Sequence, residues 1–231
     1  MSNEGRDELR DDVRDDVRDD VWYAAYGSNI ERRRFSLYLD GGTNPVSGRV
    51  TVGCRDSRPP TDDRPAALRA QLLFARHSPG WNGAVAFLDA DRPGETLGRV
   101  WRITREQFSD LVAQECGRPP GSLDPDAFTQ IGAASPRTIA NRTGWYGRLV
   151  WLGDLDGLPM LTCTSPDDLG DEEPRQPALS YLATIARGLD ECGHPHESIV
   201  SYLHETPGVA RGWDREGLTR ALREAEWPPP V

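Results

Sequence analysis

The sequence TREQFSDLVAQE, residues 104–115, carries a carboxylate where a helix would normally have an apolar side chain. Phe108, Leu111 and Val112 are spaced i, i+3 and i+4, and Glu115 takes the next position on the same face. Burial disfavours the charged form of a carboxyl group, which suits a general acid/base that works near neutral pH. A helix that ends at Glu115, with the carboxylate in water or paired with an arginine, explains the spacing at least as well.

A second candidate is the corner Tyr-Gly-Ser-Asn at residues 26–29, which follows the apolar run VWYAA. A strand that ends in Gly-Ser-Asn and leads into a helix exposes free backbone N–H groups at the helix N-terminus. Such donors can hold a carboxylate or a developing oxyanion. An ordinary strand-to-helix turn, with Ser28 or Asn29 as the N-cap, accounts for the same residues. The corner taken alone favours the ordinary turn.

Other reactive patterns are weaker. Cys192, His194 and His196 form a Cys-x-His-x-His cluster, but the spacing is not that of a zinc module, and Pro195 indicates a loop. A zinc deacetylase needs a His/Asp ligand set with catalytic histidines, and four scattered histidines give it little support. The sequence has no Gly-x-Ser-x-Gly elbow of a serine hydrolase. Cys54 lies beside an arginine, which would favour a thiolate, but a structural cysteine is the better interpretation.

Composition restricts the classes of function. The 231 residues carry a formal net charge of −10, which argues against non-specific binding to nucleic acid or to an anionic membrane. All 27 basic residues are arginines, which excludes a Schiff-base or P-loop lysine and favours a GC-rich genome. Four cysteines without a CxxC pair favour reduced thiols. With no apolar run of membrane-spanning length and no apolar leader, we expect a cytoplasmic protein.

Positioning these groups requires strands and helices that the sequence also indicates. Strand-like runs cover residues 21–26, 67–75, 83–90, 96–104, 145–153 and 158–165. Helical periodicity covers about 29–39, 104–115, 177–191, 195–205 and 214–226. Residues 53–66 are expected to be a loop, and 116–143 a long excursion over the surface.

Cap and turn signals mark several boundaries. Gly41-Gly42 should end the first helix, and Thr104 with Gln107 fits a capping box at the start of the second. An Asp156-Gly157 turn should join the last two strands. Strands that come first and helices that gather late favour an α+β fold, with a small mixed, curved β-sheet or barrel and flanking helices. We expect a charged extension over residues 1–20, disordered or helical, followed by one domain over 21–231.

Taken in order along the chain, these features resemble the γ-glutamylcyclotransferase-like superfamily. YAAYGSNI is similar to its N-terminal Tyr-x-Ala-Tyr-Gly-Ser-Asn signature, and GWNGAVAFLD and LGRVWRIT are similar to two of its strands. The family's catalytic glutamate lies in a Gln-Glu-Gly sequence at a helix end, and residues 114–117 here read Gln-Glu-Cys-Gly. Late in the chain, PALSYLATIARG places Tyr181 at the family's tyrosine. The resemblance spans about residues 21–192, and the long 116–143 excursion and Cys116 depart from the pattern.

The resemblance implies a reaction in which the α-amine of a γ-glutamyl amide or γ-glutamyl amino acid attacks its own γ-carbonyl, releasing an amine and 5-oxoproline. Glu115 would be the catalytic acid/base of this cyclotransferase, a lyase. The residues implied in substrate binding are Tyr23, Ala24, Ala25, Tyr26, Gly27, Ser28, Asn29 and Tyr181. No metal, nucleotide or organic cofactor is implied, and the partner is a small molecule, not nucleic acid or membrane. The alternative is a non-catalytic ligand-binding or interaction module on the same fold.

Overall fold

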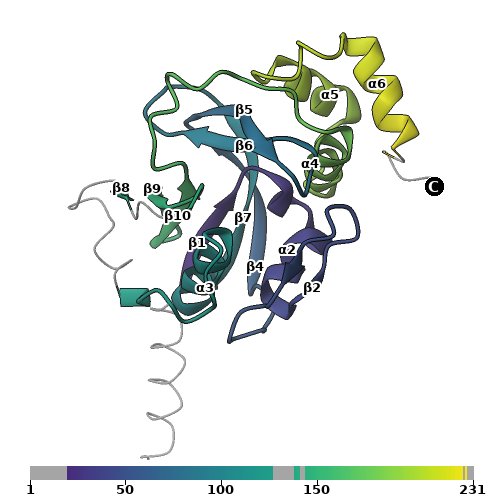
Figure 1. The fold of residues 1–231 in the computed structure, drawn as a ribbon. Coiled ribbons are helices and arrows are strands. Elements are labelled where there is room, and N and C mark those ends of the chain that lie inside the picture. The colour runs from purple at the N-terminus through teal and green to yellow at the C-terminus, as the bar shows by residue number, and fades with distance from the viewer. Residues whose placement is uncertain (1–19, 127–137, 141–143, 226, 228–231) are drawn as a thin grey trace, which may run out of the picture.

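The computed structural model describes residues 20–126, 138–140, 144–225 and 227 (Figure 1). The charged extension expected over residues 1–20 therefore lies, apart from Asp20, outside the described residues. Much of the excursion expected over 116–143 lies outside them as well. No helix of the described part is long and apolar enough to cross a membrane.

One six-stranded mixed sheet forms the centre of the molecule, in the order β4-β7-β1-β10-β9-β8. Its strands are β1 (Asp20–Ala25), β4 (Asp62–Leu68), β7 (Thr96–Thr104), β8 (Thr138–Ala140), β9 (Arg148–Leu155) and β10 (Leu158–Thr164). β1 runs antiparallel to β7 and parallel to β10. All six residues of β1 are buried. This burial explains why residues 21–25 of the strand form a continuous apolar run without polar alternation.

Two short antiparallel ribbons accompany the sheet. β5 (Gln71–Ser78) pairs with β6 (Gly83–Asp89), and β2 (Gly42–Thr43) pairs with β3 (Val50–Thr51). Every residue of β6 is buried. Figure 1 shows the β5–β6 ribbon at the end of the sheet that the C-terminal helices cover.

The helices are η2 (Ser28–Ile30), α2 (Arg32–Asp40), α3 (Arg105–Glu115), α4 (Leu179–Glu191), α5 (His196–Glu205) and α6 (Arg215–Glu224). The Thr104–Gln107 capping box at the start of α3 is confirmed in both of its hydrogen bonds. α2 ends at Gly41, whose φ of 78° is a conformation that glycine adopts without strain. Strands followed by late helices give the α+β class that the sequence predicts.

The structure corrects two of the strand and loop boundaries. The loop expected over 53–66 is wrong in its second part, because Asp62 to Leu68 pair with β7. Pro65 is tolerated there since β4 is an edge strand of the sheet. The strand expected over 67–75 is interrupted by a bend at Arg69-Ala70, so that its two halves belong to different sheets.

Two further expectations missed local structure. The helix expected over 29–39 is divided at Glu31 into the short 3-10 turn η2 and the α-helix α2. The excursion expected over 116–143 contains the strand β8, which pairs with β9. Its three residues, Thr-Ile-Ala, are too few to give a period-2 signal.

Candidate active site

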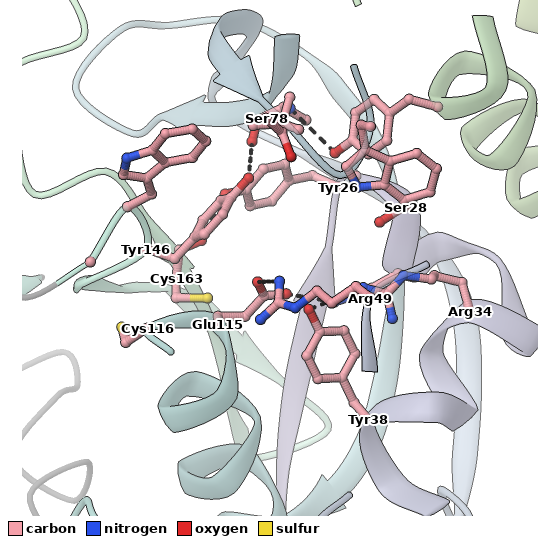
Figure 2. Close-up of a pocket in the computed structure, with 18 of the residues that line it drawn as sticks. Tyr26, Ser28, Arg34, Tyr38, Arg49, Ser78, Glu115, Cys116, Tyr146 and Cys163 are labelled. Carbon is pink, nitrogen blue, oxygen red and sulfur yellow. Dashed lines mark hydrogen bonds and ion pairs between the residues drawn. The ribbon is translucent and has the colours of Figure 1, made fainter. Parts of the chain in front are cut away.

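One cavity of about 290 Å³ brings together residues from segments that are far apart in the sequence (Figure 2). Of the residues singled out in the sequence, those that line it are Tyr23, Tyr26, Gly27, Ser28, Asn29, Glu115 and Tyr181. Ala24 and Ala25 do not line it, because they lie fully buried within β1, where they pair with β7. The helix-end glutamate, the corner after β1 and the late tyrosine thus share one concave site.

The corner is shaped by a close approach between Gly27 and Tyr181. A Cβ atom on Gly27 would lie 2.9 Å from the Tyr181 hydroxyl, so only glycine leaves room for this contact. Gly27 is the N-cap of η2 and Glu31 that of α2, and neither cap has a side-chain hydrogen bond. The side chains of Ser28 and Asn29 are therefore not used as N-caps.

Tyr181 reaches the cavity from α4, and its hydroxyl accepts a hydrogen bond from the Ala86 backbone N–H at 3.3 Å. Burial raises the pKa of Tyr181 to about 12, although hydrogen bonds from the backbones of Ala86 and Ser28 act to lower it. The phenol therefore keeps its proton at neutral pH. A hydroxyl that accepts backbone hydrogen bonds still has its own proton to donate to a ligand.

Glu115 is the last residue of α3, and its side chain is only 12% exposed. Asn29 Nδ2 donates to its Oε1 at 3.3 Å, which links the corner directly to the carboxylate. The same Nδ2 also donates to the Tyr23 hydroxyl at 3.1 Å, so Asn29 orients the glutamate from a fixed position. The helix therefore ends at Glu115 and the carboxylate lies near an arginine, Arg49, as the simpler interpretation of the spacing expected, while the side chain also lines the cavity.

Sequence reasoning missed two arginines of this site. Arg49 donates from Nη2 to the Gln114 carbonyl at 2.7 Å, and its Nη1 lies 3.9 Å from Glu115 Oε2. Arg34 lies on α2 and borders the cavity with a side chain that Figure 2 shows reaching inward. In the sequence, Arg34 shares a helical face with Phe35, Tyr38 and Leu39, and this spacing was a usable signal. With Glu115 as the one carboxylate of the described lining, the two guanidinium groups favour an anionic ligand.

Aromatic rings that the sequence did not single out form much of the remaining wall. Tyr146 donates to the Ala86 carbonyl at 3.0 Å and stacks on Phe87 with ring centroids 5.1 Å apart. Trp81 packs edge-on against Tyr181. Trp145 also lines the cavity and is 38% exposed. Aromatic walls around a few polar groups are typical of small-molecule sites.

The weaker candidates lie elsewhere or have no reactive environment. In the described part of the chain, no group of three or more His, Cys, Asp or Glu side chains could hold a metal ion. His196 Nε2 lies 3.0 Å from Asp190 Oδ1, which gives this ring a structural partner. Burial and the nearby Asp110 raise the pKa of Cys54 to about 12, so its thiol stays protonated.

Comparison with known proteins gives one relative by sequence and several by structure. No family model matches the chain. "Histone deacetylase 5" of Arabidopsis thaliana is 35% identical over 187 residues, which are 75% of this chain. This chain spans 28% of the length of that relative.

The similar solved structures include a "Gamma-glutamyl cyclotransferase" at 17% identity and a TM-score of 0.49, covering 89% of this chain and 99% of that one. An uncharacterized protein from Homo sapiens has 19% identity and a TM-score of 0.48, with the same two coverages. YkqA from Bacillus subtilis has 16% identity and a TM-score of 0.47, covering 86% of this chain and 60% of that one. These names describe those proteins, and the function of this chain is inferred from its own cavity.

Proposed function

We propose that this chain is a cofactor-free γ-glutamylcyclotransferase that releases 5-oxoproline from a γ-glutamyl amide or γ-glutamyl amino acid. The observation that carries the proposal is the hydrogen bond from Asn29 to Glu115, which joins two segments of one cavity across 86 residues of sequence. The sequence resemblance had assigned the acid/base to one of these segments and substrate binding to the other. Their meeting in a single site supports both assignments.

Each proton in this reaction has a group in the cavity that can carry it. Glu115 takes a proton from the α-ammonium group of the substrate, and the freed amine attacks the γ-carbonyl carbon. Glu115 then returns the proton to the nitrogen of the leaving amine as the old C–N bond breaks. The ring nitrogen still carries one proton more than the lactam of 5-oxoproline, and the regenerated Glu115 carboxylate takes this second proton and passes it to the departing amine. Ring closure is intramolecular, and well-oriented reactions of this kind reach effective molarities of about 10⁵–10⁸ M. Positioning therefore supplies much of the acceleration.

The oxygen of the attacked carbonyl gains negative charge and needs donors. The protonated Tyr181 hydroxyl lies at the corner, close to Gly27 and the Ser28 backbone. We assign this hydroxyl as the hydrogen-bond donor to the developing charge, together with backbone N–H groups of the corner. Asn29 acts as a positioning residue because it holds Glu115 from the same corner.

The test is 5-oxoproline release by the purified chain from a panel of γ-glutamyl amides and γ-glutamyl amino acids. Glu115→Gln keeps the shape of the side chain and removes its basicity, so we expect a loss of about 10²- to 10⁴-fold. The matched control is Glu106→Gln, on the same helix but paired with Arg55 outside the cavity lining. Turnover that survives Glu115→Gln contradicts the mechanism. Binding of the panel without any turnover by the wild type supports the non-catalytic module instead.

A further inference from the structure

The cavity contains a buried cation whose charge is not neutralised by the described residues. Arg34 is 4% exposed, and no described group accepts a hydrogen bond from its Nε or Nη1. Its Nη2 donates to the neutral Tyr38 hydroxyl at 3.2 Å, and the guanidinium lies 4.6 Å from the centre of that ring. Buried charges are normally paired, because desolvating an unpaired one is costly. An anionic group of a ligand would neutralise this guanidinium.

The depth of Arg34 indicates which part of a ligand it would meet. Figure 2 shows Arg34 entering on the side of Ser28, across the cavity from Cys116 and Tyr146. Exposed residues of the cavity lining lie next to these two in the sequence, because Gly117 follows Cys116 and Gly144 and Trp145 precede Tyr146. A leaving group that departs past these exposed residues comes from the end of the substrate that is remote from Arg34. The end that stays behind is the γ-glutamyl group.

Resting on the cyclotransferase function proposed above, we propose that Arg34 binds the α-carboxylate of the γ-glutamyl group. A guanidinium is well suited to this role, since its planar set of donors matches a carboxylate. The Tyr38 hydroxyl that accepts from Arg34 also has a hydrogen bond with Glu115, so a carboxylate held at Arg34 lies in the same part of the cavity as the acid/base. The enzyme then rejects γ-linked substrates whose α-carboxylate is amidated or absent.

The kinetic test compares a γ-glutamyl amide with its α-carboxamide counterpart, which differs only in the missing negative charge. We expect Arg34→Gln to raise KM for the free carboxylate by about 10- to 100-fold, the range of a hydrogen bond to a charged group. Turnover of the α-carboxamide, already slow in the wild type, should barely change. Arg34→Lys should recover part of the preference. Arg33→Gln, an exposed neighbour on the same helix, is the matched control.

A binding test runs without catalysis. Titration calorimetry with 5-oxoproline and with 5-oxoprolinamide should show a preference for the carboxylate in the wild type and in Arg33→Gln, and none in Arg34→Gln. If Arg34→Gln weakens the affinity for both ligands equally, the proposal is overturned. In the kinetic test it is overturned if the rise in KM depends on the carboxylate of the leaving amino acid. An unchanged carboxylate preference in Arg34→Gln also overturns it.

The two tests separate this inference from the function on which it rests. If the wild type never turns over but binds 5-oxoproline through Arg34, the anion site stands and the cyclotransferase function fails. If turnover is normal and Arg34→Gln retains the wild-type preference, only the assignment of Arg34 fails. Circular dichroism of each variant confirms that it is folded.

Discussion

Two arginines of this chain are equally buried but differ in whether carboxylates of the chain neutralise their charge. Arg34 and Arg99 are both 4% exposed. Arg99, on β7, forms ion pairs with Asp63 and with Glu191, the latter at 2.7 Å, and lies 4.1 Å from the centre of the Trp101 ring. Arg34 has the single neutral partner Tyr38 among the described residues.

The difference separates a structural charge from a functional one. Arg99 joins three elements, because Asp63 belongs to β4, Glu191 to α4 and the arginine itself to β7. Its charge is neutralised within the chain, so no ligand is needed. The charge of Arg34 borders a cavity and is left for whatever binds there. Two equally buried arginines can therefore have different roles. The presence or absence of carboxylate partners within the chain distinguishes the structural one from the ligand-binding one.

The largest expected effect is on stability at Arg99. Arg99→Met removes the shared cation and leaves Asp63 and Glu191 without it, so we expect a loss of about 3 kcal/mol in the free energy of unfolding. This figure is at the low end of the usual range since both carboxylates are partly exposed. Urea denaturation monitored by tryptophan fluorescence measures it. A loss below about 1 kcal/mol would show that the ion pairs of Arg99 with Asp63 and Glu191 contribute little to holding β4, β7 and α4 together.

The pH dependence of that loss is the second prediction. Burial acts to raise the pKa of Asp63, but the hydrogen bonds from Arg32 and Arg99 outweigh it and hold the pKa below its ordinary value. A lowered carboxylate pKa stabilises the fold above about pH 4 and loses this effect as the pH falls through the folded-state pKa. The gap in unfolding free energy between wild type and Arg99→Met should therefore shrink below about pH 4. A constant gap down to pH 2 would contradict the role of Asp63.

The matched substitution at Arg34 should behave differently. Arg34→Met removes an unpaired buried charge together with one hydrogen bond and a cation–π contact, so the opposing terms largely cancel. We expect the unfolding free energy of the ligand-free chain to stay within about 1 kcal/mol of the wild type. Added 5-oxoproline should raise the melting temperature of the wild type but not of Arg34→Met. A loss as large as that of Arg99→Met would mean that the fold itself depends on Arg34.

The sequence predicted the parts of the site that carry local signals. The Thr104–Gln107 capping box and the apolar spacing before Glu115 located the catalytic candidate on its helix. The end of β1 was evident because an apolar run stops at a glycine. These signals depend on residues that are neighbours in the chain, which is why they can be read without the fold.

Arg34 was missed because its position in a run of charges outweighed its spacing with the apolar residues of the same helix. It lies within the run Glu-Arg-Arg-Arg, and a run of charges on a short helix normally faces solvent. Its burial depends on the packing of α2 against α3 and α4, which are far from α2 in the sequence. β4 was missed for a related reason, because its Asp- and Pro-containing sequence is suited to an edge strand but reads as a loop.

The smallest expected loss of unfolding free energy is at Arg32. This arginine is exposed but pairs with the same carboxylate as the buried Arg99, so it tests whether burial or pairing matters more. Its side chain is 56% exposed and lies 2.6 Å from the same Asp63 that Arg99 contacts. An exposed ion pair contributes little, so Arg32→Gln should cost about 0.5 kcal/mol. In the Arg99→Met background, Arg32 is the remaining cation at Asp63, and its removal should cost more. Urea denaturation of the wild type, both single variants and the double variant measures this coupling. Strict additivity would show that the two arginines act on Asp63 independently, and that burial of Arg99, not the shared carboxylate, determines its contribution.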